Sequence, residues 1–204
     1  MSRISFFDPG LAGRVFFTAL AFMWIVFLLP GRSIGADSSS SLSAEDRKSL
    51  EIAFELLESS LSAEAELKWL VIFKKLTFEG PAKEVEEIMK KIQATSEARA
   101  KEFRKLRKLA PAVTAKPPPS PMGDAIESAA QEAGTEELIF SSGVFNIRFL
   151  FLQAQATRMI SVVAEQAAKV DPNDERSDWL TRVSNEFEDY RDDLVEIAKL
   201  CSIK

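Results

Sequence analysis

The chain has 204 residues, a formal net charge of −5 at pH 7, no histidine and a single cysteine, Cys201. The lack of histidine excludes the usual general base near neutral pH, the Ser-His and Cys-His nucleophile pairs and most zinc sites. The negative charge argues against a nucleic-acid partner, and one cysteine cannot form an internal disulfide. No glycine-rich phosphate loop occurs, so we expect neither enzymatic activity nor a bound cofactor.

The N-terminal segment has the pattern of a secretory signal peptide. Basic residues precede an apolar run at 15–29, and small residues follow at 33–36. A membrane-spanning helix needs roughly 20 apolar residues, so this run is short for a permanent anchor. We therefore expect 1–36 to be cleaved, 37–43 to be a disordered lead-in, and the mature protein to be periplasmic or extracellular. In the alternative, 15–29 stays in place as a membrane anchor.

Helical periodicity covers residues 44–204, which we predict to form one domain. Ser43 and Asp46 match a capping box, which opens a helix whose apolar spacing continues to Leu76. After a break that contains glycine and proline, a second helix is expected over 81–109. The first two helices are therefore expected to form a hairpin with a short connection.

A second helical hairpin is expected after a proline-rich linker at 111–121. Its helices are predicted from about 142 to 170 and, after a turn at 171–174, to near Cys201. The inner side of its first helix is expected to contain Ile147, Leu150, Phe151, Ala154, Ile160, Ala164 and Ala168. No window shows the alternation of a strand, so the sequence predicts an all-α, antiparallel four-helix bundle.

The apolar stripe of the second helix is interrupted at its middle. Ile92 and Phe103 belong to the stripe, but Thr95, Ser96 and Arg99 occupy the positions between them. In one interpretation these residues form a polar interior, where Arg99 needs a carboxylate partner because an unpaired buried charge is costly. In the other interpretation the helix exposes all three to solvent.

Charged residues are distributed unevenly between helices. The second helix is mainly basic and the fourth mainly acidic, which indicates complementary solvated faces or, alternatively, a basic face for anionic polymers or lipid. An all-oxygen metal site is conceivable among the carboxylates, although a wet acidic surface is the ordinary interpretation. The candidate metal ligands are Glu64, Glu66, Asp189, Asp193 and Glu196.

Three stretches resemble a family of secreted bacterial domains of unknown function, often labelled predicted outer membrane proteins. They are "SAEDRKSLEIAFELLESSLSAEAELKWL", "EVEEIMKKIQATSEARAKEFRKL" and "DERSDWLTRVSNEFEDYRDDLVEIAKL". The resemblance implies a ferritin-like four-helix bundle. Family members carry a histidine on each of the last three helices, at positions that correspond here to Ser96, Thr157 and Asp193. The resemblance therefore implies polar interior positions at these residues and the loss of any site that depends on histidine.

These observations leave several functional hypotheses. The first is an exported, non-catalytic bundle that binds a protein or another component of the cell envelope. The alternative is a bundle that binds metal through carboxylates alone, or a degenerate ferritin-like redox bundle. A further alternative is a membrane-associated bundle that keeps 15–29 as its anchor.

Overall fold

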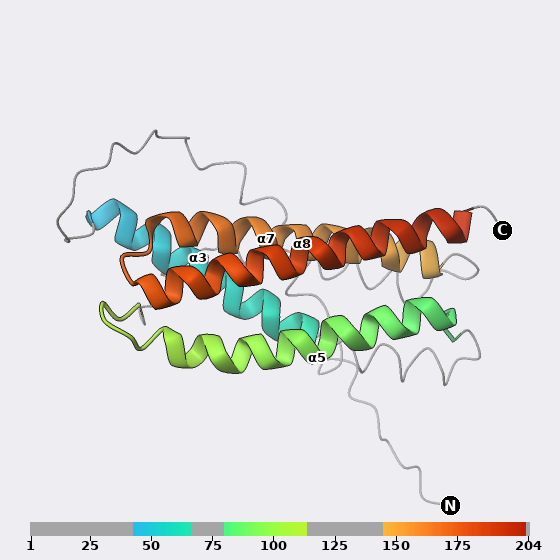
Figure 1. Cartoon of the computed structure of the whole chain (residues 1–204), viewed down its shortest axis with the longest axis horizontal. Helices are drawn as coiled ribbons and strands as arrows, with labels where there is room; N and C mark the ends of the chain where they lie inside the picture. The colour runs from blue at the N-terminus through green and yellow to red at the C-terminus, as the bar shows by residue number, and fades with distance from the viewer. Residues whose placement is uncertain (1–42, 67–79, 114–144, 203–204) are drawn as a thin grey trace, which may run out of the picture.

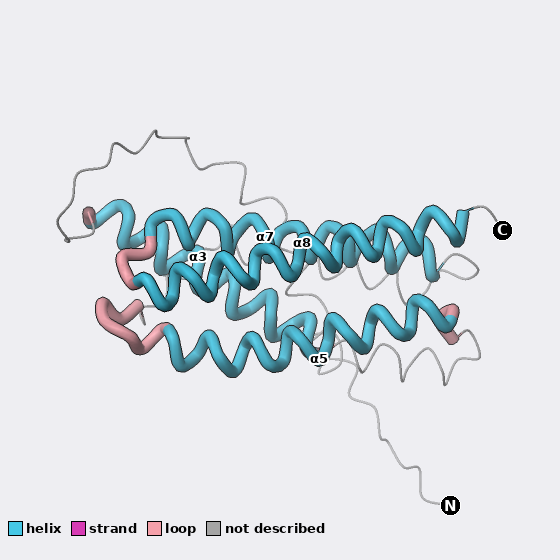
Figure 2. Tube along the Cα trace, in the orientation of Figure 1, coloured by secondary structure: helices cyan, strands magenta, loops and turns pink. Residues whose placement is uncertain are grey.

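The computed structural model describes residues 43–66, 80–113 and 145–202 (Figure 1). These ranges contain helices and connecting turns and no strand (Figure 2). The helices are α3 (Ala44–Ala65), α5 (Lys83–Leu106), α7 (Phe145–Val170) and α8 (Asp174–Ser202). The predicted all-α class is thereby confirmed. The signal peptide 1–36, the lead-in up to residue 42 and the linker residues 114–121 lie outside the described residues.

The four described helices pack side by side as a bundle (Figure 1). Each packs against two others: α7 against α8 and α3, and α5 against α3 and α8, with α7 and α8 in the closest association. Buried apolar residues from all four helices form one continuous core. None of the helices in the described ranges combines the length and apolarity that crossing a membrane requires.

Local hydrogen bonds explain where the helices begin. The Ser43 hydroxyl accepts a 3.0 Å bond from the Asp46 backbone N–H and donates a 2.7 Å bond to its carboxylate, which confirms Ser43 as the N-cap of α3. At the start of α8, the Asn173 side-chain oxygen accepts a 2.9 Å bond from the Arg176 backbone N–H. The start of α5 is tied to α7, because the Asn146 side-chain oxygen accepts from the Ala82 N–H at 3.1 Å.

The second helix is shorter than its periodicity suggests. The predicted range was 81–109, whereas α5 ends at Leu106. Beyond it the backbone N–H groups of Lys108 and Leu109 bond to carbonyls three residues back, at 3.1 and 3.0 Å. This tighter turn ends the α-helix and directs the chain toward the start of α8.

An aromatic cluster lies near the C-terminal end of α5. Phe54 meets Phe103 edge to face at a centroid distance of 4.9 Å, and Phe103 stacks on Trp179 at 5.2 Å. The cluster joins α3, α5 and α8, and all three rings are buried. Each such ring stabilises the fold by roughly 1.5–3 kcal/mol through burial.

Candidate functional site

A layer of buried polar side chains crosses the middle of the apolar core. Its members are Ser60 and Glu64 of α3, Ser96 of α5, and Gln153 and Thr157 of α7, and none is more than 7% exposed. We call this set the polar layer. Polar side chains in such a position need hydrogen-bond partners, because losing water without compensation costs about 1–3 kcal/mol per group.

Contacts between helices place Glu64, Ser96 and Gln153 at neighbouring levels of the bundle. Ala65 and Glu66 line a surface groove together with Glu97 and Lys101, so the turn that contains Glu64 lies beside the turn that contains Ser96. Glu64 is hydrogen-bonded to the Gln153 side chain, which connects α3 to α7 at the same level.

At the level of the polar layer, the fourth helix, α8, contributes aromatic side chains. Thr95, the neighbour of Ser96 on α5, shares a 2.6 Å hydrogen bond with the Tyr190 hydroxyl of α8. Tyr190 and Phe187 are both buried and meet edge to face at 5.7 Å. Within the described ranges, α8 therefore closes the layer with rings.

Four oxygen atoms of the polar layer lack hydrogen-bond partners among the described residues. They are one side-chain oxygen each of Ser60, Glu64, Ser96 and Gln153. The Thr157 hydroxyl, by contrast, is satisfied, because it donates to the Gln153 backbone carbonyl at 2.9 Å. Buried unpartnered atoms are rare in folded proteins, so these four atoms make the polar layer the strongest candidate for a functional site.

Burial also controls the charge of Glu64. Removal from water raises the pKa of this carboxyl group to about 8, although the hydrogen bond with Gln153 opposes the rise. In the absence of another charge, Glu64 is therefore protonated and neutral at pH 7. A buried arginine could neutralise an ionised Glu64. The buried arginines of the described ranges, Arg107 and Arg176, are however paired with other carboxylates.

A half-buried ion-pair network lies at the edge of the bundle between α5 and α8. Arg99 donates to Glu186 and to Glu102, each at 2.7 Å, and Glu102 also accepts a 2.9 Å bond from the Trp179 indole N–H. The Trp179 bond, with help from Arg99, lowers the pKa of Glu102 below its ordinary value. Arg99 thus has the carboxylate partner that an interior position demands.

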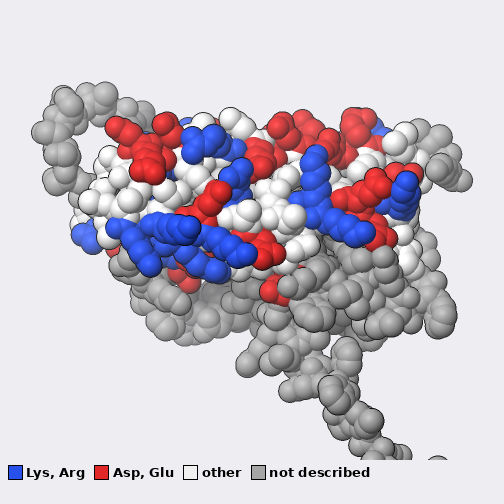
Figure 3. Space-filling model, turned by 60° about the horizontal axis from the view of Figure 1, so that its bottom comes forward, with Lys and Arg blue, Asp and Glu red and all other residues white. Residues whose placement is uncertain are grey.

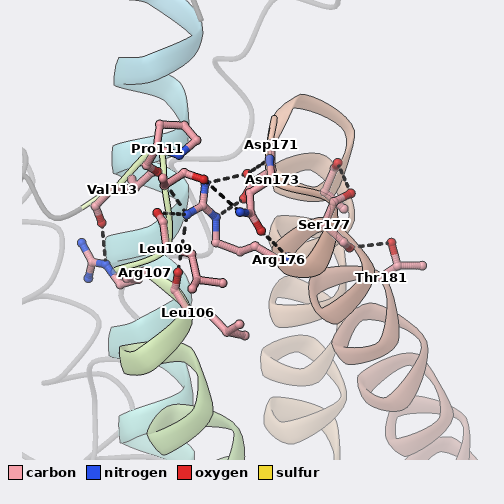
Figure 4. A network of polar contacts seen from close by, with 12 residues as sticks. Leu106, Arg107, Leu109, Pro111, Val113, Asp171, Asn173, Arg176, Ser177 and Thr181 are labelled. Carbon is pink, nitrogen blue, oxygen red and sulfur yellow. Dashed lines mark hydrogen bonds and ion pairs between the residues drawn. The ribbon is translucent and has the colours of Figure 1, made fainter. Parts of the chain in front are cut away.

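A second buried polar cluster, which we call the arginine latch, fastens the α7–α8 turn to the end of α5 (Figure 4). Arg176 is fully buried and donates from two nitrogens to the Asp171 carboxylate, one of these bonds measuring 2.7 Å. Its remaining terminal nitrogen donates to the backbone carbonyls of Leu106, Leu109 and Pro111. The Asn173 side chain adds a 2.9 Å bond to the Ala110 carbonyl.

The structure separates the predicted polar interior residues into two groups. Ser96 and Thr157 are fully buried, and Arg99 is about 28% exposed by its side chain. The interior placement of Asp193 is wrong, because its side chain is 52% exposed and pairs with Lys91 on the surface. Asp193 directly precedes the buried Leu194, and neighbouring residues of an α-helix point about 100° apart, so Asp193 faces solvent beside the core-facing stripe.

The candidate metal ligands do not come together. Glu64 is buried, whereas Asp189, Asp193 and Glu196 are exposed on α8 and Glu66 is only partly buried. Among the residues that the structure describes, no group of three or more acidic or cysteine side chains is placed to hold a metal ion. A carboxylate-only metal centre is therefore not assembled within these ranges.

The basic and acidic faces meet across the bundle. Arg99 with Glu186 and Lys91 with Asp193 join α5 to α8, at 2.7 and 3.2 Å. Figure 3 shows Lys and Arg side chains interleaved with Asp and Glu over this face of the molecule. This arrangement agrees with complementary helix faces.

Three large apolar side chains are exposed at one end of the α7–α8 pair. Ile147, Phe151 and Leu200 are 47%, 63% and 62% exposed. The N-terminal end of α7 and the C-terminal end of α8 lie at the same end of the bundle (Figure 1). We call these residues the apolar patch. Leu150 is buried as predicted, but the predicted inner positions of Ile147 and Phe151 are wrong, because Phe149 faces the core instead.

Comparisons with known proteins assign no relative. No family model matches the chain, and no curated protein or solved structure matches it. The class that the described residues define is an all-α helical bundle, and the resemblance drawn from the sequence stays a prediction.

Proposed function

We propose that the chain is an exported, non-catalytic helical bundle that binds a protein of the cell envelope through the apolar patch. The single observation that carries this proposal is the exposure of Ile147, Phe151 and Leu200 at one end of the bundle. Isolated exposed apolar residues are common, but a group of large ones at one end is typical of a contact surface.

The proposed topology is an antiparallel, ferritin-like bundle. Contacts that step in opposite directions along neighbouring helices support it. Between α7 and α8, Ser161 pairs with Ser184 and Arg158 with Glu188. Between α5 and α8, Thr95 pairs with Tyr190, whereas the later Arg99 pairs with the earlier Glu186.

Site-specific photo-crosslinking tests the proposed contact. A photoreactive residue placed at Phe151 should capture one envelope protein in living cells. The control position is Glu165, which lies nearer the opposite end of α7 and is about half-exposed. The proposal predicts an adduct at the first position and none at the second, whereas equal yields at both positions would contradict it.

Affinity measurements with the purified partner complete the test. Phe151→Ser and Ile147→Ser should each weaken binding about tenfold or more, since apolar anchors carry most of the energy of an interface. Glu165→Ser should bind as the unchanged protein does. If both patch variants bind at full affinity, the apolar patch is not the contact surface.

The proposed export has its own test. Protein recovered from the envelope fraction should have an N-terminus near Asp37, just after the predicted signal peptide. Recovery of a chain that still begins at Met1 would contradict cleavage and favour the membrane-anchored alternative.

A further inference from the structure

The unpartnered atoms of the polar layer form a chemically uniform set. Ser60 and Ser96 each present a hydroxyl oxygen, Gln153 an amide oxygen and Glu64 a carboxyl oxygen. Each belongs to a side chain at least nine-tenths buried. Oxygen atoms of these kinds are the ligands that hard cations prefer in proteins.

The charge of the layer restricts which cation fits. Glu64 is the one acidic member, and Arg107 and Arg176, the buried cations of the described ranges, belong to other ion pairs. An ionised Glu64 would carry one negative charge in a medium of low polarity, where an uncompensated charge is strongly disfavoured. One monovalent cation gives a neutral site, whereas a divalent cation leaves one buried positive charge.

We propose that the polar layer binds one alkali-metal cation through the side-chain oxygens of Ser60, Glu64, Ser96 and Gln153. With Glu64 ionised, one such cation leaves the layer neutral. The amide and hydroxyl oxygens provide ligands without adding charge, and the Gln153–Glu64 hydrogen bond orients two of the four ligands.

A surface groove lies over the same helical turns. The groove between α3 and α5 is lined by residues adjacent to Glu64 and Ser96 in the sequence, including Ala65 and Glu97. A buried cation site needs a route from solvent. Charged groups face this level from two sides. Glu66, Glu97, Lys101 and Arg104 line the groove, and the Arg99–Glu186 pair and the Tyr190 hydroxyl lie on the side of α8.

Linkage between sodium binding and folding tests the proposal. Unfolding is measured at about pH 9, where the Glu64 proton is readily displaced, in sodium chloride with choline chloride holding the ionic strength constant. Above saturation, the folding equilibrium constant of the unchanged protein should rise about tenfold for each tenfold rise in sodium concentration. The unfolded chain lacks the assembled ligands, so sodium should bind only the folded state and stabilise it.

Two variants and a comparison of ions make the result decisive. Glu64→Gln removes the charge with little change of shape and should abolish the sodium dependence, and Ser96→Ala should weaken sodium binding. Ser62→Ala, at a partly buried serine that lines the groove, should leave the sodium dependence unchanged. A layer that holds only water would show no sodium dependence in the unchanged protein, which would overturn the proposal. An equal sodium dependence in Glu64→Gln, or a response to Ca²⁺ but to no alkali-metal ion, would overturn it as well.

Discussion

Replacing Arg176 with methionine should unfasten the arginine latch while keeping a side chain of similar length. Both partners of the Arg176–Asp171 pair are fully buried by their side chains. The variant therefore leaves the Asp171 carboxylate buried without its cation, which typically costs about 3–5 kcal/mol. It also removes the donor shared by three backbone carbonyls of the α5 end.

We expect the free energy of unfolding to fall by about 4 kcal/mol, which corresponds to a decrease of about 8–16 °C in Tm for a domain of this size. Urea unfolding followed by tryptophan fluorescence measures the change, because Trp179 is buried against Phe103. The matched control is Arg182→Met, at an exposed arginine six residues further along α8, which should change the stability by less than about 0.5 kcal/mol.

A double variant separates the loss of the pair from the loss of packing. Asp171→Leu in the Arg176→Met background removes the stranded carboxylate and should recover part of the lost stability. If the free energy of unfolding of Arg176→Met lies within about 1 kcal/mol of that of the unchanged protein, the buried pair does not fasten the turn and the reasoning fails.

Three further predictions follow from the core and the polar layer. In sodium-free buffer, Glu64 should make stability highest below pH 4.5 and reduce it as the pH rises toward its folded pKa of about 8, because only the unfolded state releases the proton over this interval. The loss should reach about 3 kcal/mol by pH 7 and be absent in Glu64→Gln, as chemical denaturation at several pH values would show. Phe103→Ala should cost about 3–5 kcal/mol by the same assay, since the ring is fully buried between Phe54 and Trp179. Tyr190→Phe should cost only about 1 kcal/mol, because it removes one hydrogen bond to the Thr95 hydroxyl and no packing.

Apolar periodicity and capping residues predicted the described helices well, because both act within a few residues of the chain. The N-cap at Ser43 is one example, since its partner lies three positions away. The burial of Ser96 agrees with one of the two interpretations of the sequence, because its position continues the stripe of Ile92 and Phe103. Helical spacing thus allowed a buried Ser96 but could not decide between the two interpretations.

The contacts of the arginine latch could not be predicted in this way. Arg176 was placed in a helix after a turn, but its acceptors include the carbonyls of Leu109 and Pro111, more than 60 residues earlier in the chain. Arginine is rarely fully buried, so sequence statistics favour an exposed position. Only the folded arrangement of three helices brings these backbone atoms to its guanidinium group.

The errors on α7 have a different cause. Ile147, Phe149, Leu150 and Phe151 make the start of this helix apolar on nearly every side. The periodicity alone then cannot say which stripe contacts α3 and α8 and which faces outward. The rotation of α7 is decided by packing against its neighbours, and this left Ile147 and Phe151 exposed.

The most direct test of this account is an NMR titration of the Glu64 side-chain carboxyl carbon in sodium-free solution. A carboxyl group sealed inside the bundle and hydrogen-bonded to Gln153 should titrate with a pKa of about 8. A pKa near the ordinary value of 4.5 would show that Glu64 meets water, and it would contradict the buried polar layer.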